Sequence, residues 1–561
     1  MIAKIKDSHN QKRSVRSSLP LGLIALVAFL WVAILLNSIY TYRSPLHNHP
    51  PKAGERLDTA LTKRLVFVLM DGLRLDTSLQ SEIMPTLNDL RQKGAWATMH
   101  SQPPSYSQPA YTVLMTGASP ELSDGPIFNL DYDAIRVWTQ DNVFAAAHRA
   151  GVKTAVAGYY WFERLIPAET VDVHFYTAGE DRVADEQVVA AALPWLLSKD
   201  FQFILIHLDQ VDYAGHHEGG PSDERWMAAA QRVDHLLNQI VATLNLSQDT
   251  LLVCSDHGHI DDGGHGGHET VVLREPFLLI GAGIKPGHYE DIQQVDVAPT
   301  IAALLGINLP ASSQGRVLTE MLTLDDEALK IIGDAQTEQQ RILVEAFRSA
   351  ITSQPASLSV EAASGEGTPT MEDIRQSKFN AERPPRIVLS LLALAVGWVL
   401  ILRRWKQELA YLLGGVVLYG AVFHIIYILI GKYAYSLSTI RSPSAFLSHL
   451  LVTVSIAYGL LCLLIYAVWS ARKFALIEYR EDIRGFTYIL VYLLSLPVLW
   501  YFSLYGATLT WTLPDFHLFM VALLSLVQIG IVALLGVIFT ALLTMICEIN
   551  PQWRYNFMSK R

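Results

Sequence analysis

The chain has very little cysteine for its length. Three cysteines occur among 561 residues, at Cys254, Cys462 and Cys547, and no two of them are close in the sequence. Such sparse thiols exclude a disulfide framework and argue against a zinc site built from cysteine. We therefore expect any globular part of the chain to be stabilised by its hydrophobic core.

Positive charge is also in short supply. The 43 lysines and arginines are outnumbered by 53 aspartates and glutamates, which gives a formal net charge of −10. Proteins that bind nucleic acid need clustered cations to neutralise phosphates, and the cationic clusters of this chain lie beside apolar segments. The sequence therefore argues against a nucleic-acid partner.

Apolar residues, by contrast, are abundant. Hydrophobic residues make up 51% of the chain and charged residues only 17%, which is too apolar for a wholly soluble protein of this length. Six apolar runs reach or approach the length of a membrane-spanning helix: Leu19 to Tyr40, Ile387 to Leu402, Leu409 to Ile430, Phe446 to Trp469, Phe486 to Tyr505, and Leu518 to Ile546. The second run is short, so either its flanking arginines, Arg386 and Arg403, extend toward the membrane surface or the bilayer is thinner there. His424 lies inside the third run, where either a functional role or an interhelical hydrogen bond explains it.

The distribution of cations predicts the orientation of these spans. Residues 1–18 contain five of them, Lys4, Lys6, Lys12, Arg13 and Arg16, and such segments stay in the cytoplasm. We expect residues 19–40 to be an uncleaved anchor rather than a signal peptide, because no A-x-A-like cleavage site follows them. Six spans then return the tail, residues 547–561, to the cytoplasm. The globular part is expected to be extracytoplasmic, in a protein of the cell membrane.

Residues 60–322 have the pattern of an α/β domain. Four short segments are almost continuously apolar, as are buried strands of a parallel sheet: Arg64 to Gly72, Gly151 to Tyr160, Phe201 to Asp212, and Thr250 to Gly258. Helical patterns such as Pro85 to Lys93 and Asp223 to Leu244 alternate with them, which favours the α/β class. Residues 323–385 are expected to be a stalk or linker, and residues 386–546 a transmembrane bundle of five helices.

Acidic and imidazole side chains follow three of the predicted strands, at Asp71, at Asp209 and Asp212, and at Asp256 and His257. The carboxyl ends of parallel strands are where open α/β sheets bind ligands. Several carboxylates at one edge would repel each other unless cations neutralise them. The pattern therefore predicts a metal site.

Two histidine-containing loops add ligands of the same kind. His216 follows Asp212 in the segment DYAGH, and His265 lies in the glycine-rich segment VCSDHGHIDDGGHGGHE, which runs from Val253 to Glu269. Oxygen and nitrogen ligands without thiolate suit Zn²⁺ or Mn²⁺.

A candidate nucleophile lies in the segment PPSYSQPAYTVLMTG, from Pro103 to Gly117. Ser105 and Ser107 occupy a proline-bounded turn that leads into a predicted helix, whose first amides favour an anion. A serine hydroxyl becomes a nucleophile only when a base or a metal activates it.

Taken in order, these motifs resemble those of the alkaline phosphatase superfamily. They are DG at Asp71, PSYSQP at Pro104, LMTG at Leu114, DYAGH at Asp212, SDHG at Ser255 and GGHGG at Gly263. Within the superfamily, the chain looks most like the nucleotide pyrophosphatase/phosphodiesterases and the GPI ethanolamine phosphate transferases. The resemblance covers Leu65 to about Leu318 and implies a doubly wound, mainly parallel sheet.

The resemblance implies two divalent metal ions, zinc or alternatively manganese. One ion would be held by Asp71, Ser107, Asp256 and His257, and the other by Asp212, His216 and His265. His268 would be an additional histidine outside the ligand set.

The same resemblance implies that Ser107 is the nucleophile, with Ser105 as the alternative. Asn129 falls where the phosphodiesterases carry an asparagine that helps to bind a phosphoryl oxygen. Sulfatases share the fold but require an arginine where this chain has Tyr111, so a sulfatase is disfavoured.

The expected reaction is a double displacement through a phosphoserine-type intermediate. The layout of one N-terminal span, a catalytic domain and a C-terminal bundle resembles that of the GPI ethanolamine phosphate transferases. We therefore expect transfer of phosphoethanolamine, or a similar headgroup, from a phospholipid to a membrane glycan or lipid. The alternatives are a membrane-tethered phosphodiesterase or phosphatase that hydrolyses nucleotides or other phosphate esters, and an inactive domain that only binds a ligand.

Overall fold

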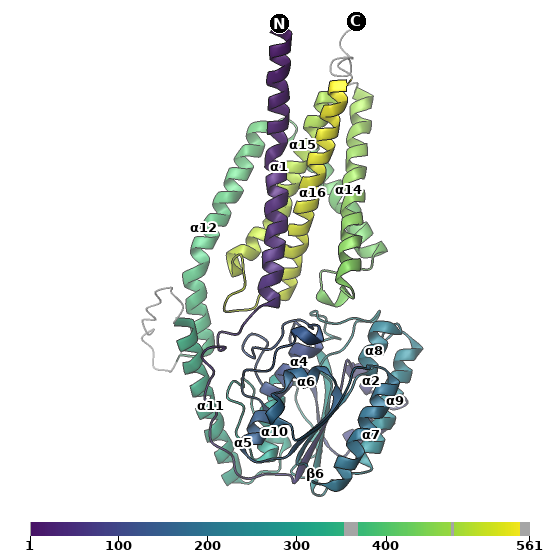
Figure 1. Ribbon diagram of the computed structural model, residues 1–561, viewed down its shortest axis with the longest axis vertical. Helices are drawn as coiled ribbons and strands as arrows, with labels where there is room; N and C mark the ends of the chain where they lie inside the picture. The colour runs from purple at the N-terminus through teal and green to yellow at the C-terminus, as the bar shows by residue number, and fades with distance from the viewer. Residues whose placement is uncertain (1, 353–368, 473–475, 550–561) are drawn as a thin grey trace. The chain divides into compact units, whose positions relative to one another are not determined.

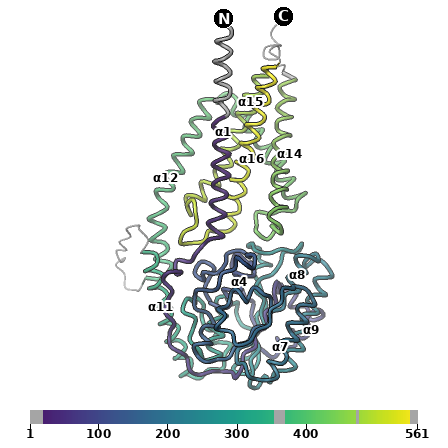
Figure 2. Tube along the Cα trace, viewed as in Figure 1, coloured from purple at the N-terminus to yellow at the C-terminus, as the bar shows by residue number. Residues whose placement is uncertain are grey.

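The computed structural model describes residues 2–352, 369–472 and 476–549, which fall into two units (Figures 1 and 2). The globular unit contains Ile39–Ser377 and Thr510–Phe516, and the helical unit contains the remainder. The middle of the predicted linker and the end of the predicted cytoplasmic tail lie outside the described residues.

A nine-stranded sheet forms the centre of the globular unit, in the order β4-β3-β5-β1-β6-β7-β2-β8, with β9 also paired to β2. The strands are β1 (Arg64–Met70), β2 (Ala95–His100), β3 (Thr154–Tyr159), β4 (Val173–Thr177), β5 (Phe203–Leu208), β6 (Asp249–Cys254), β7 (Arg274–Gly281), β8 (Gly287–His288) and β9 (Ile292–Gln293). Strands β4, β3, β5, β1 and β6 are parallel, and β7 is antiparallel to both of its neighbours. The four predicted strands are β1, β3, β5 and β6, and the α/β class is confirmed.

Helices cover both faces of this sheet (Figure 1). They are α2 (Leu75–Ser78), α3 (Pro85–Arg91), α4 (Ser107–Thr116), α5 (Val143–Arg149), α6 (Trp161–Leu165), α7 (Arg182–Ser198), α8 (Gln210–His217), α9 (Glu224–Val241), α10 (Val297–Leu305) and α11 (Asp326–Thr352), with short 3-10 turns at Tyr132–Ala134, Ala168–Thr170, Gln294–Asp296 and Thr319–Met321. Alternate residues of β1 belong to two hydrophobic clusters: Leu65, Phe67 and Leu69 pack with α4, α5 and α10, whereas Val66, Val68 and Met70 pack with α3, α7 and α9. Burial on both faces explains why the central strands are continuously apolar.

Helix α11 differs from the linker expected at residues 323–385. Its apolar residues recur at helical spacing, and Ile332, Leu343 and Phe347 are buried against the globular unit. The buried side chain of Gln339 donates hydrogen bonds to the carbonyl oxygens of Ala311 and Ser313, at 2.9 and 2.8 Å. This amphipathic helix is therefore part of the domain, because one of its faces completes the hydrophobic core.

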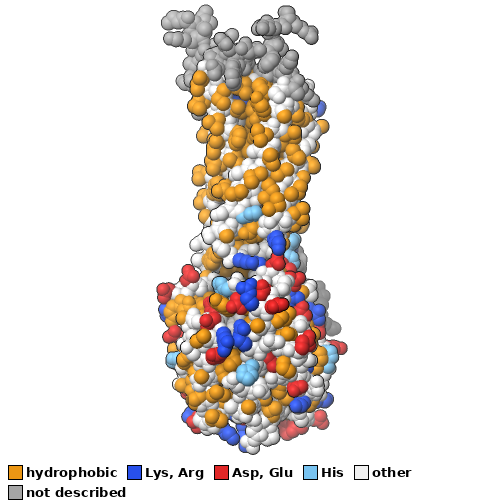
Figure 3. Space-filling model, turned by 90° about the vertical axis from the view of Figure 1, so that its right-hand side faces the viewer, with side chains coloured by type: hydrophobic (Ala, Val, Ile, Leu, Met, Phe, Trp, Pro, Cys, Tyr) orange, Lys and Arg blue, Asp and Glu red, His pale blue; other side chains and the backbone are white. Residues whose placement is uncertain are grey.

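The helical unit consists of long apolar helices. They are α1 (Ile2–Tyr40), α12 (Met371–Trp405), α13 (Leu409–His424) continued by a π-helix (Ile425–Ile430), α14 (Pro443–Arg472), α15 (Leu476–Tyr505) and α16 (Phe516–Ile549), with a 3-10 turn at Leu437–Thr439. Six of these helices are long and apolar enough to cross a membrane, so the chain is an integral membrane protein. Apolar side chains cover this unit, whereas charged side chains gather on the globular unit (Figure 3).

The short apolar run beginning at Ile387 is part of the 35-residue helix α12. The helix continues past both flanking arginines, Arg386 and Arg403. His424, expected to be either functional or bonded across helices, makes its two hydrogen bonds to residues near it in the sequence. Its Nδ1 donates to the carbonyl oxygen of Gly420 at 2.7 Å, and its Nε2 accepts from the hydroxyl of Tyr435 at 2.8 Å.

Candidate metal centre

Three neighbouring parallel strands, β5, β1 and β6, carry acidic residues at their carboxyl ends. Asp209 directly follows β5, Asp71 directly follows β1, and Asp256 lies two residues after β6. All three side chains are buried. Because the strands are adjacent and parallel, the carboxylates lie at one edge of the sheet, where α/β proteins bind ligands.

Four of the predicted residues surround one point at this edge. The Nε2 atom of His257 lies 3.5 Å from Asp71 Oδ1, 3.3 Å from Asp256 Oδ2 and 3.3 Å from Ser107 Oγ. Ser107 is the first residue of α4, so that helix carries its hydroxyl to the carboxylates. Among the described residues, neither Asp71 Oδ1 nor Asp256 Oδ2 has a hydrogen-bond partner, although both are buried. Buried, unsatisfied carboxylate oxygens are destabilising unless a cation binds them.

A second set of ligands lies around Asp212, in α8. Its Oδ2 atom is 3.4 Å from His216 Nε2, and its Oδ1 atom is 3.6 Å from His265 Nε2. The two imidazole Nε2 atoms are themselves only 2.9 Å apart. The structure therefore brings together Asp212, His216 and His265, which come from α8 and from the glycine-rich loop.

Ser105 holds the glycine-rich loop in place. Its carbonyl oxygen accepts a hydrogen bond from His265 Nδ1 at 2.9 Å, which fixes the tautomer and leaves His265 Nε2 as a lone-pair donor. Its hydroxyl accepts from the amide of Gly266 and donates to the carbonyl oxygen of Gly267, at 3.1 and 3.2 Å. Ser105 is thus engaged by the loop, whereas Ser107 faces the carboxylates.

His259 belongs to the site, although the sequence analysis did not include it among the ligands. Its Nδ1 accepts from the amide of Gly264 at 2.9 Å, so its Nε2 carries the proton and donates to Asp212 Oδ1 at 2.7 Å. A Cβ atom on Gly215 would lie 2.3 Å from the ring, so glycine is required there. The signal was present in the sequence, because His259 is one of four histidines in a segment that already supplies three expected ligands, Asp256, His257 and His265.

His207 and Tyr111 also belong to the site and were likewise absent from the expected ligand set. Asp71 Oδ2 accepts hydrogen bonds from the Tyr111 hydroxyl and from His207 Nε2, the latter at 2.9 Å. These two contacts orient the carboxylate so that its Oδ1 atom faces His257. His207 could have been noticed as a single imidazole within the apolar strand β5, and Tyr111 as the residue that replaces the arginine of sulfatases.

The electrostatics of the site favour bound cations. Burial, together with repulsion from Asp71, raises the pKa of Asp256 well above its usual value. Burial lowers the pKa of His257 and of His265 and brings the pKa of His259 to about 4. These three imidazoles are therefore neutral at neutral pH, as metal ligands must be, while the ionised form of Asp256 requires positive charge nearby.

The acidic and imidazole side chains gather in three compact groups, whose nearest oxygen or nitrogen atoms all lie within 4.8 Å of one another: Asp212, His216, His259 and His265; Asp71, Asp212 and His257; and Asp71, His207 and Asp209. In these groups His259 and His207 donate hydrogen bonds to the carboxylates. Together with the orphaned carboxylate oxygens, this donor set fits divalent metal ions.

The remaining predicted residues lie beside these ligands or outside them. Asn129 Oδ1 accepts from the amide of Gln108 at 3.0 Å, which places Asn129 next to Ser107 and makes its Nδ2 the end that can donate to a substrate. His268 is exposed at the surface of the loop.

Part of the globular unit is similar to known proteins. Residues 65–263 match the model of the type I phosphodiesterase / nucleotide pyrophosphatase family. Among solved structures, murine ectonucleotide pyrophosphatase / phosphodiesterase 5 is similar to 46% of this chain and to all of its own, with 15% identity and a TM-score of 0.39.

Curated relatives have a similar domain. GPI ethanolamine phosphate transferase 2, catalytic subunit, from Homo sapiens is 29% identical over 282 residues, which cover 47% of this chain and 28% of that protein. GPI ethanolamine phosphate transferase 2 from Aspergillus fumigatus is 24% identical over 331 residues, which cover 54% of this chain and 43% of that protein. The chain thus spans less than half the length of these two relatives.

Proposed function

Because residues 65–263 match the model of the type I phosphodiesterase / nucleotide pyrophosphatase family, we propose that this membrane protein is a metal-dependent phosphotransferase of the alkaline phosphatase superfamily. It transfers phosphoethanolamine, or a similar headgroup, from a phospholipid to a membrane glycan or lipid. The observation that carries the proposal is the convergence of the Ser107 hydroxyl with His257 and with two orphaned carboxylate oxygens at one sheet edge.

In this proposal Ser107 is the nucleophile. Its Oγ atom forms a bond to the phosphorus of the donor while the bond between phosphorus and the diacylglycerol oxygen breaks, which leaves phosphoethanolamine on the serine. The serine proton passes to the released diacylglycerol. In the second step, an acceptor hydroxyl bonds to the same phosphorus, and Ser107 recovers its proton.

The ligands for two divalent ions, zinc or alternatively manganese, are divided as the resemblance implies. Asp71, Ser107, Asp256 and His257 hold one ion, and Asp212, His216 and His265 hold the other. When bound, the ions neutralise the phosphoryl charge and favour the ionised serine. His259 orients Asp212, whereas Tyr111 and His207 orient Asp71.

Two further features would bind the phosphoryl group. The first turn of α4 presents backbone amides beside Ser107, and helix N-termini favour anions. The Asn129 carboxamide is fixed by its bond to the Gln108 amide, so its Nδ2 donates to a phosphoryl oxygen.

The choice of a lipid donor rests on the helical unit and on the relatives. A phosphodiesterase that acts on soluble substrates has little need of six spans, and the relatives are named GPI ethanolamine phosphate transferases. The cations of residues 1–18 favour a cytoplasmic N-terminus, so the globular unit is extracytoplasmic.

A second candidate is a membrane-tethered phosphodiesterase or phosphatase. The family match supports it, because the matched family is itself named for phosphodiesterases. The same covalent intermediate would then be transferred to water.

The test is to find the covalent intermediate. The purified full-length protein, loaded with zinc, is incubated with phosphatidylethanolamine vesicles, and Ser107 is examined by peptide mass spectrometry. We expect a phosphoethanolamine adduct on Ser107 and release of diacylglycerol.

Two variants sharpen this experiment. Ser107→Ala should abolish both the adduct and the diacylglycerol, whereas Ser105→Ala should keep the adduct on Ser107. An adduct on Ser105 would show that Ser105, and not Ser107, is the nucleophile. If the protein cleaved a generic aryl phosphodiester but formed no lipid-derived adduct, the proposal of a lipid donor would be wrong. The second candidate function, a membrane-tethered phosphodiesterase, would then be favoured.

A further inference from the structure

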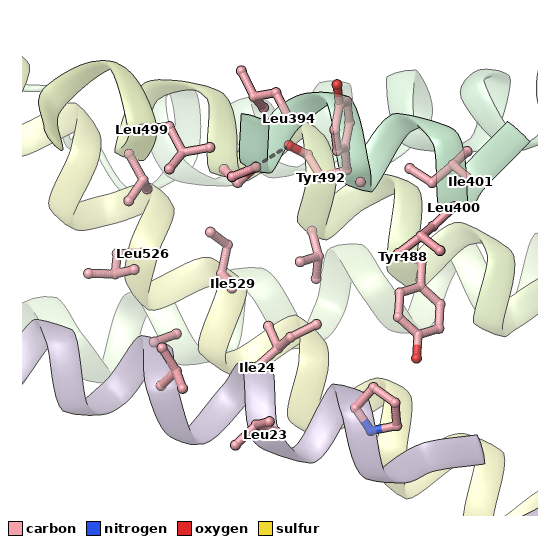
Figure 4. A pocket seen from close by; sticks show the side chains of 18 of the residues that line it. Leu23, Ile24, Leu394, Leu400, Ile401, Tyr488, Tyr492, Leu499, Leu526 and Ile529 are labelled. Atoms are coloured by element: carbon pink, nitrogen blue, oxygen red, sulfur yellow. Dashed lines mark hydrogen bonds between the residues drawn. The ribbon is translucent and has the colours of Figure 1, made fainter. Parts of the chain in front are cut away.

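A large cavity lies within the helical unit, between α1, α12, α15 and α16 (Figure 4). Its volume is about 840 Å³, and side chains such as Leu23, Leu394 and Ile529 make its walls almost entirely apolar. A second void of about 380 Å³ shares Val27 and Ala393 with it and also lies along α1 and α12. Together they form a continuous apolar crevice.

The crevice coincides with poor packing of two helices. In the most apolar 18-residue stretch of each helix, the share of buried residues is 22% for α1 and 11% for α12, but 72% for α16. Helices in a membrane associate through close packing. Much of the apolar surface of α1 and α12 is therefore not covered by protein.

One end of the cavity is charged and aromatic. Arg404 and Trp405 close it from α12, and Arg484 and Tyr488 close it from α15. The Trp405 and Tyr488 rings lie 5.4 Å apart. Tryptophan, tyrosine and arginine are typical of the level at which lipid headgroups lie.

Positive charge exceeds negative charge in this cluster. Glu481 Oε2 pairs with Arg404 at 2.7 Å, and its Oε1 pairs with Arg484 at 2.9 Å and with Arg480 at 3.3 Å. Three guanidinium groups thus contact one carboxylate, and two of them line the cavity. An additional anion would complement this charge.

We infer that the cavity binds an anionic phospholipid, with its acyl chains between α1, α12, α15 and α16 and its phosphate at Arg404 and Arg484. This lipid is distinct from the proposed donor. The charged end lies at the C-terminus of α12 and near the N-terminus of α15, whereas the chain continues into the globular unit from the opposite ends of α1 and α12. The lipid fills the crevice and thereby fastens α1 and α12 to the other helices.

The apolar walls and the charged end select this class of ligand together. The walls favour acyl chains, and the arginines favour a headgroup with net negative charge over a zwitterionic one. Each cation near an anionic lipid contributes a factor of about five to binding. The inference does not depend on the reaction catalysed by the globular unit.

The test measures lipid binding to the full-length protein in mild detergent by native mass spectrometry. Phosphatidylglycerol and phosphatidylcholine with identical acyl chains are titrated in competition. We expect a preference of at least about fivefold for phosphatidylglycerol in the unaltered protein, and Arg404→Gln should reduce that preference about fivefold. Arg404 is 61% exposed, so this change leaves the fold intact.

The matched control is Arg403→Gln, because Arg403 is the preceding residue of α12, is exposed and does not line the cavity. This control should keep the full preference. A second variant, Ala393→Phe, fills the crevice and should reduce the binding of both lipids. Equal binding of the two lipids, or equal effects of the two arginine substitutions, would overturn the inference. So would unaltered binding in Ala393→Phe.

Discussion

The globular unit and the helical unit use apolar residues in opposite ways. Every residue of β1 is buried, whereas large apolar residues of the helical unit, such as Leu392 and Leu463, are exposed by 58% and 64%. Polar pairs lie inside the helical unit instead, including Tyr419 with Gln528 and Tyr458 with Thr487. Lipid solvates an apolar surface at no cost, so only the unit that faces water must bury its apolar surface.

The two units also differ in where they keep charge. The globular unit buries Asp71, Asp209 and Asp256 at one sheet edge, and two of these carboxylates have oxygens without a partner among the described residues. In the helical unit, the carboxylate of Glu481 is shared by three arginines. In our proposals, the globular unit therefore depends on bound metal and the helical unit on bound lipid.

The sharpest test of this division is the replacement of Ser107 by alanine. Activity should fall by a factor on the order of 10³ or more, because a covalent route cannot proceed without its nucleophile. The globular unit should remain folded, since the change removes only one hydroxyl from a small buried side chain, and the melting temperature of the helical unit should not change. Turnover of a phosphodiester substrate and thermal denaturation are the two measurements. Near-full activity in this variant would exclude Ser107 as the nucleophile.

Removal of metal should destabilise only the globular unit. A ligand present at about 1,000 times its dissociation constant stabilises a protein by roughly 4 kcal/mol, and chelation forfeits that stabilisation. Limited proteolysis and calorimetry with and without chelator would report the two units separately. Unfolding of the helical unit alone after chelation would contradict the prediction that only the globular unit depends on metal.

A smaller effect is expected at His259, which orients Asp212. Loss of such an orienting partner typically weakens metal binding by about 10- to 100-fold, so His259→Ala should reduce metal affinity within that range. Gly215→Ala should act in the same direction, because the new methyl group would displace the His259 ring. Metal titration monitored by atomic spectroscopy gives the affinity directly. If His259→Ala retained full affinity, the hydrogen bond to Asp212 would have no orienting role.

The smallest predicted effects come from two glutamines that are each 4% exposed, Gln339 in the globular unit and Gln528 in the helical unit. Gln339→Ala removes the hydrogen bond to the Ala311 carbonyl oxygen, whereas the Ser313 carbonyl oxygen keeps a bond from Gln340 at 3.1 Å. The unsatisfied carbonyl should lower the free energy of unfolding by about 1–3 kcal/mol. Gln528→Ala removes one bond from Tyr419, and such bonds in membranes average about 0.6 kcal/mol. Equilibrium unfolding of each unit in detergent measures both changes. Equal losses of unfolding free energy would mean that a buried side-chain hydrogen bond contributes the same stability in both units.

Much of the fold was predictable because the strands of a sheet buried on both faces are continuously apolar. The strand-end residues Asp71 and Asp256 followed from the same pattern. The expected linker was less predictable: the charged face of α11 resembles a solvated stalk, and only its position in the fold reveals that Ile332 and Phe347 enter the core. Similarly, the length of α12 could not be judged from apolar residues alone, since helical hydrogen bonds continue past arginine.

The residues that orient the carboxylates could not be identified from the sequence for a different reason. His207 and His259 act through contacts with Asp71 and Asp212, which are 136 and 47 residues away in the sequence. No local pattern records such a pairing. The metal ligands themselves were easier to find, because each follows a strand or lies in a short motif.

The position of β1 in the sheet has a consequence for the order of folding. Leu65 is paired with Phe203 in β5 and with Thr250 in β6, so both neighbours of the first strand are synthesised long after it. A growing ribosomal chain therefore carries β1 with both edges unpaired until β5 has emerged, and with one edge unpaired until β6 has emerged. An exposed edge invites pairing with other chains, so this strand needs protection during biosynthesis.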